Sequence, residues 1–122
     1  MTISSLINTL ADVLSQKELA PYMALWSPSV HYRITEELTL QNTEQLNDFM
    51  LQHYFYEGVE PGKYSASNLV IAEELSDAAI FGFDLVVHSK DGEASVLGSY
   101  KACKAVKVDG EWKILSLNFY AH

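Results

Sequence analysis

Six side chains of this sequence combine chemically useful groups with positions on apolar faces of predicted elements. Hydroxyl, imidazole and amine groups donate hydrogen bonds and transfer protons in many active sites. Gathered in one pocket, they would hold a small molecule or exchange protons with it. We expect these six to line a pocket, and none of them is assigned a catalytic role. The six are Tyr22, Tyr32, His53, Tyr54, Tyr100 and Lys104.

Lys104 is the candidate whose position matters most. It is in phase with the mostly apolar set Val96, Tyr100, Ala102, Val106 and Val108. If that face looks into the interior, burial lowers the pKa of the amine by several units, because a charged group is costly to desolvate. A β-bulge or a snorkelling side chain would instead place the amine in water. Both positions remain open.

The tyrosines and His53 also have a purely structural explanation. A tyrosine on an apolar face, such as Tyr22 or Tyr32, is often a core residue whose hydroxyl is hydrogen-bonded. His53 lies on a helical stripe, and groups on such stripes mark functional sites only statistically. The pocket is therefore a hypothesis about where these side chains meet.

The other polar candidates point to the surface or to structure. Asp84 could pair with Lys104 from a neighbouring strand, but it shares a face with Gly82 and His88, which predicts a position in solvent or at an interface. Cys103 is the single cysteine, so no intrachain disulfide can form. No Cys/His group has the spacing of a zinc site, and we expect neither a metal nor a cofactor.

A long hairpin near the end of the chain must position these groups. Residues 93–108 and 111–121 are β-type runs joined by Asp109-Gly110, a strong hairpin signal. Two further runs, 64–75 and 78–88, come before them, so the pattern predicts a four-stranded antiparallel meander. Strands of this length twist and coil, and the concave face of such a sheet must be filled.

The first half of the chain predicts three helices that can fill that face. Apolar stripes at helical spacing run through residues 3–14 and 17–26. A third helix begins with Asn42 as its cap and ends by Gly58. A short half-buried strand at residues 30–35 interrupts the helices. Helices followed by strands predict the α+β class, with the helices packed on one sheet face.

Length and charge limit the classes of protein. A chain of 122 residues predicts one domain, residues 1–122. The net charge of −8 argues against nucleic acid or an anionic membrane as partner, because neutralising phosphates requires an excess of Lys and Arg. No apolar run reaches the length of a membrane span, and the first residues lack the pattern of a signal peptide. We therefore expect a cytoplasmic protein.

The element order resembles a known family. Together with the segments LWSPSVHY at residues 25–32 and GEWKI at residues 110–114, it is similar to the SnoaL-like branch of the nuclear transport factor 2-like superfamily. That group includes polyketide cyclases, ketosteroid isomerases and scytalone dehydratase. The resemblance covers nearly the whole chain. It implies a cystatin-like α+β roll, in which a cone-shaped, curved antiparallel sheet wraps around the three helices and a pocket opens at one end.

Two catalytic mechanisms of the family do not transfer to this chain. Ketosteroid isomerases place a catalytic Asp at the end of the first strand, where this sequence has Ile34 or Arg33. Polyketide cyclases use an acid on the last strand, where it has Ser116 and Asn118. The resemblance therefore implies the fold and a pocket, but not those reactions.

Two hypotheses of function follow. The first is a SnoaL-like protein that binds a small apolar or aromatic molecule in the cone without the ketosteroid-isomerase base. The alternative is an isomerase, cyclase or dehydratase acting on a small hydrophobic substrate, with Tyr32, His53 and Lys104 as hydrogen-bond or proton-transfer groups.

The outer face of the sheet predicts a homodimer. If Leu115, Leu117 and Phe119 point inward, the alternate residues of the last strand point outward. Large amphipathic rings with few charges are typical of an interface core. The competing possibility is a swapped register, with the aromatic set inside and a monomer in solution. The expected interface residues are Trp112, Ile114, Ser116, Asn118 and Tyr120.

Overall fold

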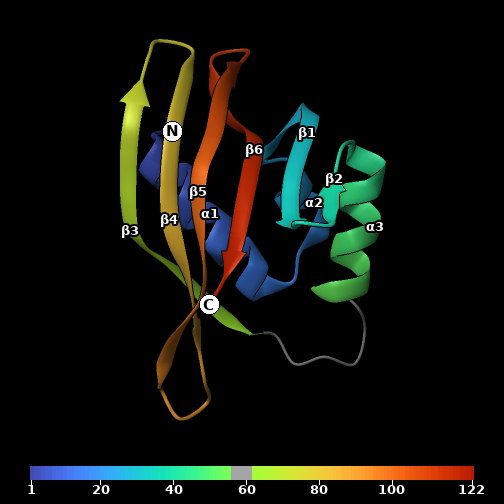
Figure 1. Cartoon of the computed structure of the whole chain (residues 1–122), viewed down its shortest axis with the longest axis vertical. Coiled ribbons are helices and arrows are strands. Elements are labelled where there is room, and N and C mark those ends of the chain that lie inside the picture. The colour runs from blue at the N-terminus through green and yellow to red at the C-terminus, as the bar shows by residue number, and fades with distance from the viewer. Residues whose placement is uncertain (56–61) are drawn as a thin grey trace.

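The computed structural model describes residues 1–55 and 62–122, and Gly58, the expected end of the third helix, lies outside this part. Three helices come early in the chain and four long strands come late, as Figure 1 shows. The elements are α1 (Ile3–Gln16), α2 (Leu19–Met23), β1 (Trp26–Thr35), β2 (Leu38–Leu40), α3 (Thr43–His53), β3 (Lys63–Glu74), β4 (Ala78–His88), β5 (Ala94–Val108) and β6 (Glu111–Ala121).

The six strands form one curved sheet in the order β2-β1-β6-β5-β4-β3. All neighbours pair antiparallel except β1 and β6, which run parallel because the chain leaves β2 through α3 before it begins the meander. In Figure 1, α1 crosses one face of the sheet, and α3 lies beside β2 at its edge. The α+β fold class is confirmed, with one parallel pair in the otherwise antiparallel sheet.

The helices begin where the capping residues predict. Thr2 accepts a hydrogen bond from the Ser5 N–H at 3.0 Å, and the Ser5 hydroxyl accepts one from the Thr2 N–H, a reciprocal capping box. Asn42 accepts a hydrogen bond from the Gln45 N–H at 2.8 Å at the start of α3. The predicted helix over residues 17–26 is shorter than expected, because α2 ends at Met23 and Trp26 already begins β1.

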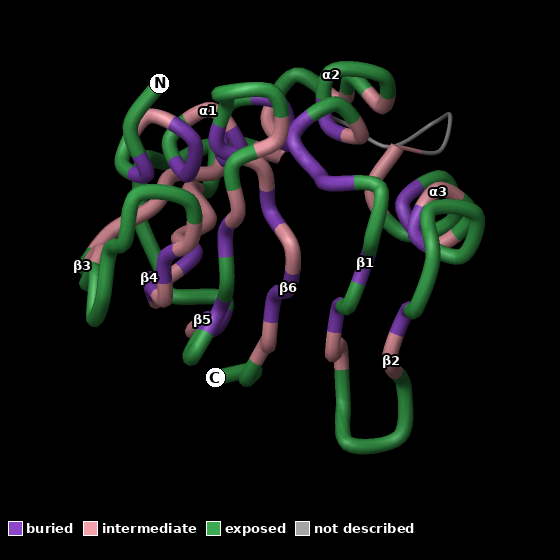
Figure 2. The backbone as a smooth tube through the Cα atoms, turned by 90° about the horizontal axis from the view of Figure 1, so that it is seen from above, coloured by how far each residue is buried: buried purple, intermediate pink, exposed green. Residues whose placement is uncertain are grey.

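The core lies between the apolar stripe of α1 and the inner sheet face. Leu6, Ile7 and Leu10 on α1 are buried against residues such as Phe81 and Leu117 of the sheet. Figure 2 shows buried segments alternating with more exposed ones along β1, β4, β5 and β6. This alternation is what a sheet with one covered face produces, since successive side chains point to opposite faces.

A β-bulge in β5 reverses the facing of its side chains. Tyr100 pairs with Phe119 and Lys104 with Ser116, so four steps on β5 match three on β6. Ala102 takes up the extra residue with φ of 51°, in the left-handed region. The Asn118 amide secures the bulge by donating hydrogen bonds to the carbonyl oxygens of Lys101 and Ala102, at 3.1 and 3.0 Å.

A second irregularity reverses β6. Lys104 pairs with Ser116 and Ala105 with Ile114, so Leu115 is the extra residue. Between the turn and Leu115, the inward-pointing side chains are even-numbered, namely Trp112 and Ile114. After Leu115 the parity changes, and the odd-numbered Leu117 points inward. The expected inward position of Leu115 is therefore wrong.

This reversal corrects the expected dimer interface. Trp112, Ile114 and Ser116 are buried within the single chain, with at most 8% of their surface exposed, so they cannot form an outer contact surface. Asn118 is half-buried, and Tyr120 is 43% exposed. Only the last two of the five expected residues are accessible. The irregularity at Leu115 turns Trp112 and Ile114 inward, whereas Ser116 pairs with the exposed Lys104 and is covered by its neighbours.

Candidate functional site

A small cavity lies in the interior between α1, α2, α3 and the sheet. Its volume is about 10 Å³, room for about one water molecule. Four of its nine lining residues are tyrosines, and the others are apolar. Among the described residues that line it, none is Asp, Glu, His, Lys or Arg. The nine are Leu10, Leu14, Tyr22, Tyr32, Met50, Tyr54, Leu85, Tyr100 and Leu117.

Tyr32 on β1 and Tyr100 on β5 form the polar centre of this cavity. Their hydroxyl oxygens are 2.6 Å apart, and both side chains are buried. Burial raises the pKa of each hydroxyl well above the ordinary value of 10, and electrostatic repulsion from other tyrosines adds to the increase. Both groups are therefore protonated donors at neutral pH and cannot act there as bases.

Stacked rings hold this pair in place. Trp26 stacks on Tyr32 with ring centroids 5.7 Å apart, and Phe83 stacks on Tyr100 at 4.7 Å. Phe119 packs against Tyr100 from β6 at 5.1 Å. Contacts of this kind restrict ring rotation, so the hydroxyls are held in position relative to the cavity.

Tyr22 and Trp26 bring a second pair of polar atoms to the same region. Burial raises the pKa of Tyr22, and the nearby Trp26 indole N–H offsets part of that increase. No hydrogen bond of normal geometry joins the two groups. Within residues 1–55 and 62–122, the Trp26 Nε1 atom is buried without a hydrogen-bond partner. Such an unpaired donor costs roughly 1–3 kcal/mol unless a water or ligand atom satisfies it.

Tyr54, at the end of α3, separates the cavity from the surface. It is half-buried, whereas the other eight lining residues are buried. Its ring lies between those of Phe49 and Tyr64, each with its centroid 6.4 Å away. Burial raises the pKa of its hydroxyl, and Tyr64 adds to the increase.

Two of the six expected pocket residues lie elsewhere. Lys104 is exposed on the outer sheet face, because the bulge at Ala102 reverses the facing between Tyr100 and Lys104. His53 is exposed on α3, where its ring packs on Phe49 with centroids 4.5 Å apart. It lines a surface groove between α3 and β2. The structure thus brings together Tyr22, Tyr32, Tyr54 and Tyr100 only.

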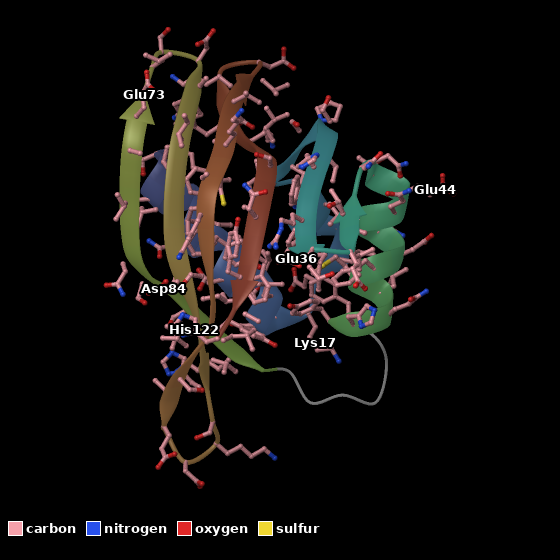
Figure 3. All side chains as sticks on the ribbon, in the orientation of Figure 1. Lys17, Glu36, Glu44, Glu73, Asp84 and His122 are labelled. Carbon is pink, nitrogen blue, oxygen red and sulfur yellow. The ribbon has the colours of Figure 1, made fainter. Side chains whose placement is uncertain are left out.

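A polar cluster lies on the outer face around Asp84. Its carboxylate accepts hydrogen bonds from Asn68 Nδ2 at 2.8 Å and from Ser99 Oγ at 2.7 Å, and these lower the pKa of Asp84. Ser99 Oγ is also 3.1 Å from His122 Nε2. Figure 3 labels Asp84 and His122 near the crossing of the long strands. Asp84 is therefore a surface residue, separate from the tyrosine-lined cavity.

Within the described part of the chain, no group of three or more His, Cys, Asp or Glu residues could hold a metal ion. The helices found there also lack the length and apolar character needed to cross a bilayer.

Cys103 is buried, and burial raises the pKa of its thiol to about 11, so it is unreactive at neutral pH.

Solved structures similar to this chain confirm the fold. A candidate scytalone dehydratase from Novosphingobium aromaticivorans matches with a TM-score of 0.82 at 15% identity, over 98% of this chain and 81% of that one. An NTF2-like protein of unknown function from Pseudomonas putida matches with 0.80 at 12%, over 98% and 84%. A protein with a cystatin-like fold from Nostoc punctiforme matches with 0.76 at 17%, over 98% and 88%.

These similarities define the class of protein. The chain has the nuclear transport factor 2-like fold, so the fold that the sequence resemblance implied is confirmed. No family model matches the sequence, and no curated protein matches it. Because proteins of this fold include both named enzymes and proteins of unknown function, the fold alone selects no reaction.

Proposed function

We propose that this protein binds a small apolar or aromatic molecule in the tyrosine-lined cavity and that binding does not depend on a catalytic base. The observation that carries the proposal is the convergence of four tyrosines from α2, β1, α3 and β5 on one cavity. Buried sites with apolar walls and a few placed polar groups are the usual form of small-molecule sites.

The chemistry of the lining favours binding over catalysis. Proton abstraction requires a base, and the candidates Lys104 and His53 lie outside the cavity. The tyrosine hydroxyls cannot serve because burial raises their pKa. What the lining offers is ring surface and neutral hydrogen-bond donors.

Ligand access requires one ring to move, because a cavity of about 10 Å³ holds no more than a water molecule. Tyr54 is the half-buried lining residue at a helix end, so its displacement disturbs the core least. A displaced tyrosine ring leaves room for a molecule of similar size, such as p-cresol. We therefore propose that the ligand is a single substituted ring.

Tryptophan fluorescence tests the proposal. The chain has two tryptophans, so Trp112→Phe leaves the signal of Trp26, which stacks on the cavity residue Tyr32. Titration with p-cresol should change that signal and saturate. As a matched control, the same titration of Trp26→Phe, which leaves Trp112 at the hairpin, should give little change. A signal that never saturates, or that is the same in both variants, would count against binding in this cavity.

The alternative is an enzyme of the isomerase, cyclase or dehydratase type. One observation favours it, the 2.6 Å contact between the Tyr32 and Tyr100 hydroxyls, because paired donors can stabilise a developing oxyanion. In such an enzyme the substrate or a bound water would have to supply the base. Turnover abolished by Tyr32→Phe and by Tyr100→Phe, with ligand binding retained, would support this alternative.

We also propose that the outer sheet face pairs with a second copy of the chain. Val70 on β3 is 63% exposed, Leu75 just after β3 is 56% exposed, and Tyr120 on β6 is 43% exposed. They flank two surface grooves of about 430 and 230 Å³ that share Ile80. An apolar surface of this kind is common at protein contacts.

The charges of this face favour a two-fold arrangement. Glu73 lies on β3 at one side of the sheet, and Lys101 and Arg33 lie toward the other side, on β5 and β1. A two-fold axis along the strands would bring the acidic side of one copy over the basic side of the other. Opposite charges facing each other in this way favour association and fix the register of the contact.

A further inference from the structure

One hydroxyl proton of the Tyr32–Tyr100 pair lacks a hydrogen-bond acceptor among the described residues. The Tyr32 and Tyr100 hydroxyls form one hydrogen bond, so one of them donates and the proton of the other needs a further acceptor. None of the hydrogen bonds between described residues supplies that acceptor. The buried Trp26 Nε1–H, close to the Tyr22 hydroxyl, is a second donor without a partner there. Two donors, one in the cavity and one beside it, therefore lack an acceptor among the described residues.

An acceptor oxygen inside the cavity would pair with the remaining hydroxyl proton of Tyr32 or Tyr100. A water molecule fits when no ligand is bound, since the volume of about 10 Å³ is about the least that admits one water and the site is lined by hydroxyls. A ligand that displaces this water gains affinity only if it reproduces the hydrogen bonds. A pure hydrocarbon would leave the donors unpaired.

The charge of the lining restricts the ligand further. Neither Lys, Arg nor His is among the described lining residues, so a buried carboxylate would have no counter-ion. Asp and Glu are also absent from the described lining residues, so a buried amine would have no counter-ion either. Burying an unpaired charge costs far more than burying a neutral polar group.

We infer that the ligand of this cavity is uncharged and presents one acceptor oxygen, as a ketone or a phenol does, to the Tyr32–Tyr100 pair. This inference rests on the proposed function and adds the chemical class of the ligand. Tyr32 and Tyr100 act in it as specificity-determining residues.

Isosteric probes test the inference. Acetophenone and α-methylstyrene have nearly the same shape and differ in a C=O against a C=CH₂ group. One neutral hydrogen bond is worth about 0.5–1.5 kcal/mol, so acetophenone should bind about 2- to 10-fold more tightly to the wild-type chain in calorimetric titration. The Tyr32→Phe/Tyr100→Phe double variant removes both hydroxyls and keeps both rings, so the difference should shrink. Benzoate, which carries a charge, should not compete with acetophenone.

The outcomes separate the inference from the function on which it rests. If α-methylstyrene binds as tightly as acetophenone, or if benzoate competes, the inference is overturned while binding in the cavity stands. If the preference persists unchanged in the double variant, the tyrosine pair is not the donor and the inference is likewise overturned. If none of the probes binds, the proposed function itself fails. Circular dichroism of the double variant establishes that it folds, and the two single variants serve in its place if it does not.

Discussion

The hydroxyl of Tyr32 contacts the hydroxyl of Tyr100 at 2.6 Å, although 68 residues separate them in the sequence. The contact spans the sheet from β1 to β5 across β6, and it is buried beneath α1 and α3. Because both groups are neutral and enclosed, each depends on the other for a hydrogen-bond partner.

This mutual dependence predicts non-additive stability. Tyr32→Phe should destabilise the fold by about 1–3 kcal/mol, because it leaves the Tyr100 hydroxyl buried and unpaired. Tyr100→Phe should do the same from the other side. The double variant should be more stable than the sum of the two single losses implies, since it leaves neither hydroxyl. Urea unfolding followed by circular dichroism measures all three, and strictly additive losses would show that the hydroxyls do not interact.

The raised pKa values of the buried tyrosines predict a loss of stability at alkaline pH. In the unfolded chain Tyr22, Tyr32 and Tyr100 ionise near the ordinary value of 10, whereas in the folded chain they stay protonated. Above that pH the unfolded state therefore binds fewer protons, and the free energy of unfolding falls as pH rises. Their contribution is fully present below pH 10. Urea midpoints measured from neutral pH upward should show this fall.

The Tyr32→Phe/Tyr100→Phe variant provides the control for the pH dependence. It removes two of the three fully buried tyrosine hydroxyls, so its stability should fall less steeply above pH 10 than that of the wild-type chain. Equal slopes would mean that other groups cause the alkaline loss.

Removing the Tyr54 ring should open a site that p-cresol fills. Tyr54→Ala deletes the half-buried ring beside the cavity, and an apolar cavity of ring size binds ring-sized ligands. The variant should be less stable than wild type, and p-cresol at millimolar concentration should raise its thermal midpoint by mass action. Tyr64→Ala is the matched control, because that ring contacts Tyr54 but does not line the cavity. Equal rescue of both variants would contradict the assigned position of the site.

The bulge in β5 predicts opposite effects of two alanine-to-glycine changes. Ala102→Gly should stabilise the fold by about 1 kcal/mol, because Ala102 has φ of 51° and glycine adopts that conformation without strain. Ala105→Gly should destabilise it, because Ala105 is buried in regular strand. Denaturant midpoints compare the two, and a loss of stability in Ala102→Gly would show that the bulge is not strained.

The proposed homodimer predicts that a charge on the outer face separates the copies. Val70→Lys places an amine on an exposed position of β3, so the single chain should fold normally. A contact of ordinary size would bury on the order of 1,600 Å² in total, and one central lysine is enough to weaken it. Light scattering should give twice 13.7 kDa for the wild type and 13.7 kDa for the variant. Leu51→Lys on α3, outside that face, should remain dimeric, and a wild type that scatters as one chain would contradict the dimer.

Much of the fold could be predicted from local signals. The capping residues Thr2 and Asn42, the Asp109-Gly110 turn and the alternation in residues 78–88 each specify a local structure by short-range chemistry. The tyrosines were also identifiable, because an aromatic hydroxyl on an apolar face must meet a partner in the core.

The facing of β5 and β6 could not be predicted. A one-residue bulge moves every later side chain to the opposite face, and alanine at position 102 gives no sign of a left-handed conformation. Lys104 and Trp112 were assigned to the wrong faces for this reason. Asn118, whose amide holds the bulge, was identified only as a dimer-interface residue, since its two hydrogen bonds depend on tertiary contact. Trp26 was missed as a site residue because it read as the end of a helix.

Native mass spectrometry tests binding in the tyrosine-lined cavity most directly. The chain would be incubated with a set of uncharged single-ring molecules, including p-cresol and acetophenone, and measured without denaturation beside Leu117→Phe, whose larger side chain fills the cavity. The account predicts one bound molecule on the wild-type chain, released on denaturation, and little or none on the variant. A wild-type chain that shows only its own mass of 13.7 kDa throughout, or a variant that binds equally well, would contradict it.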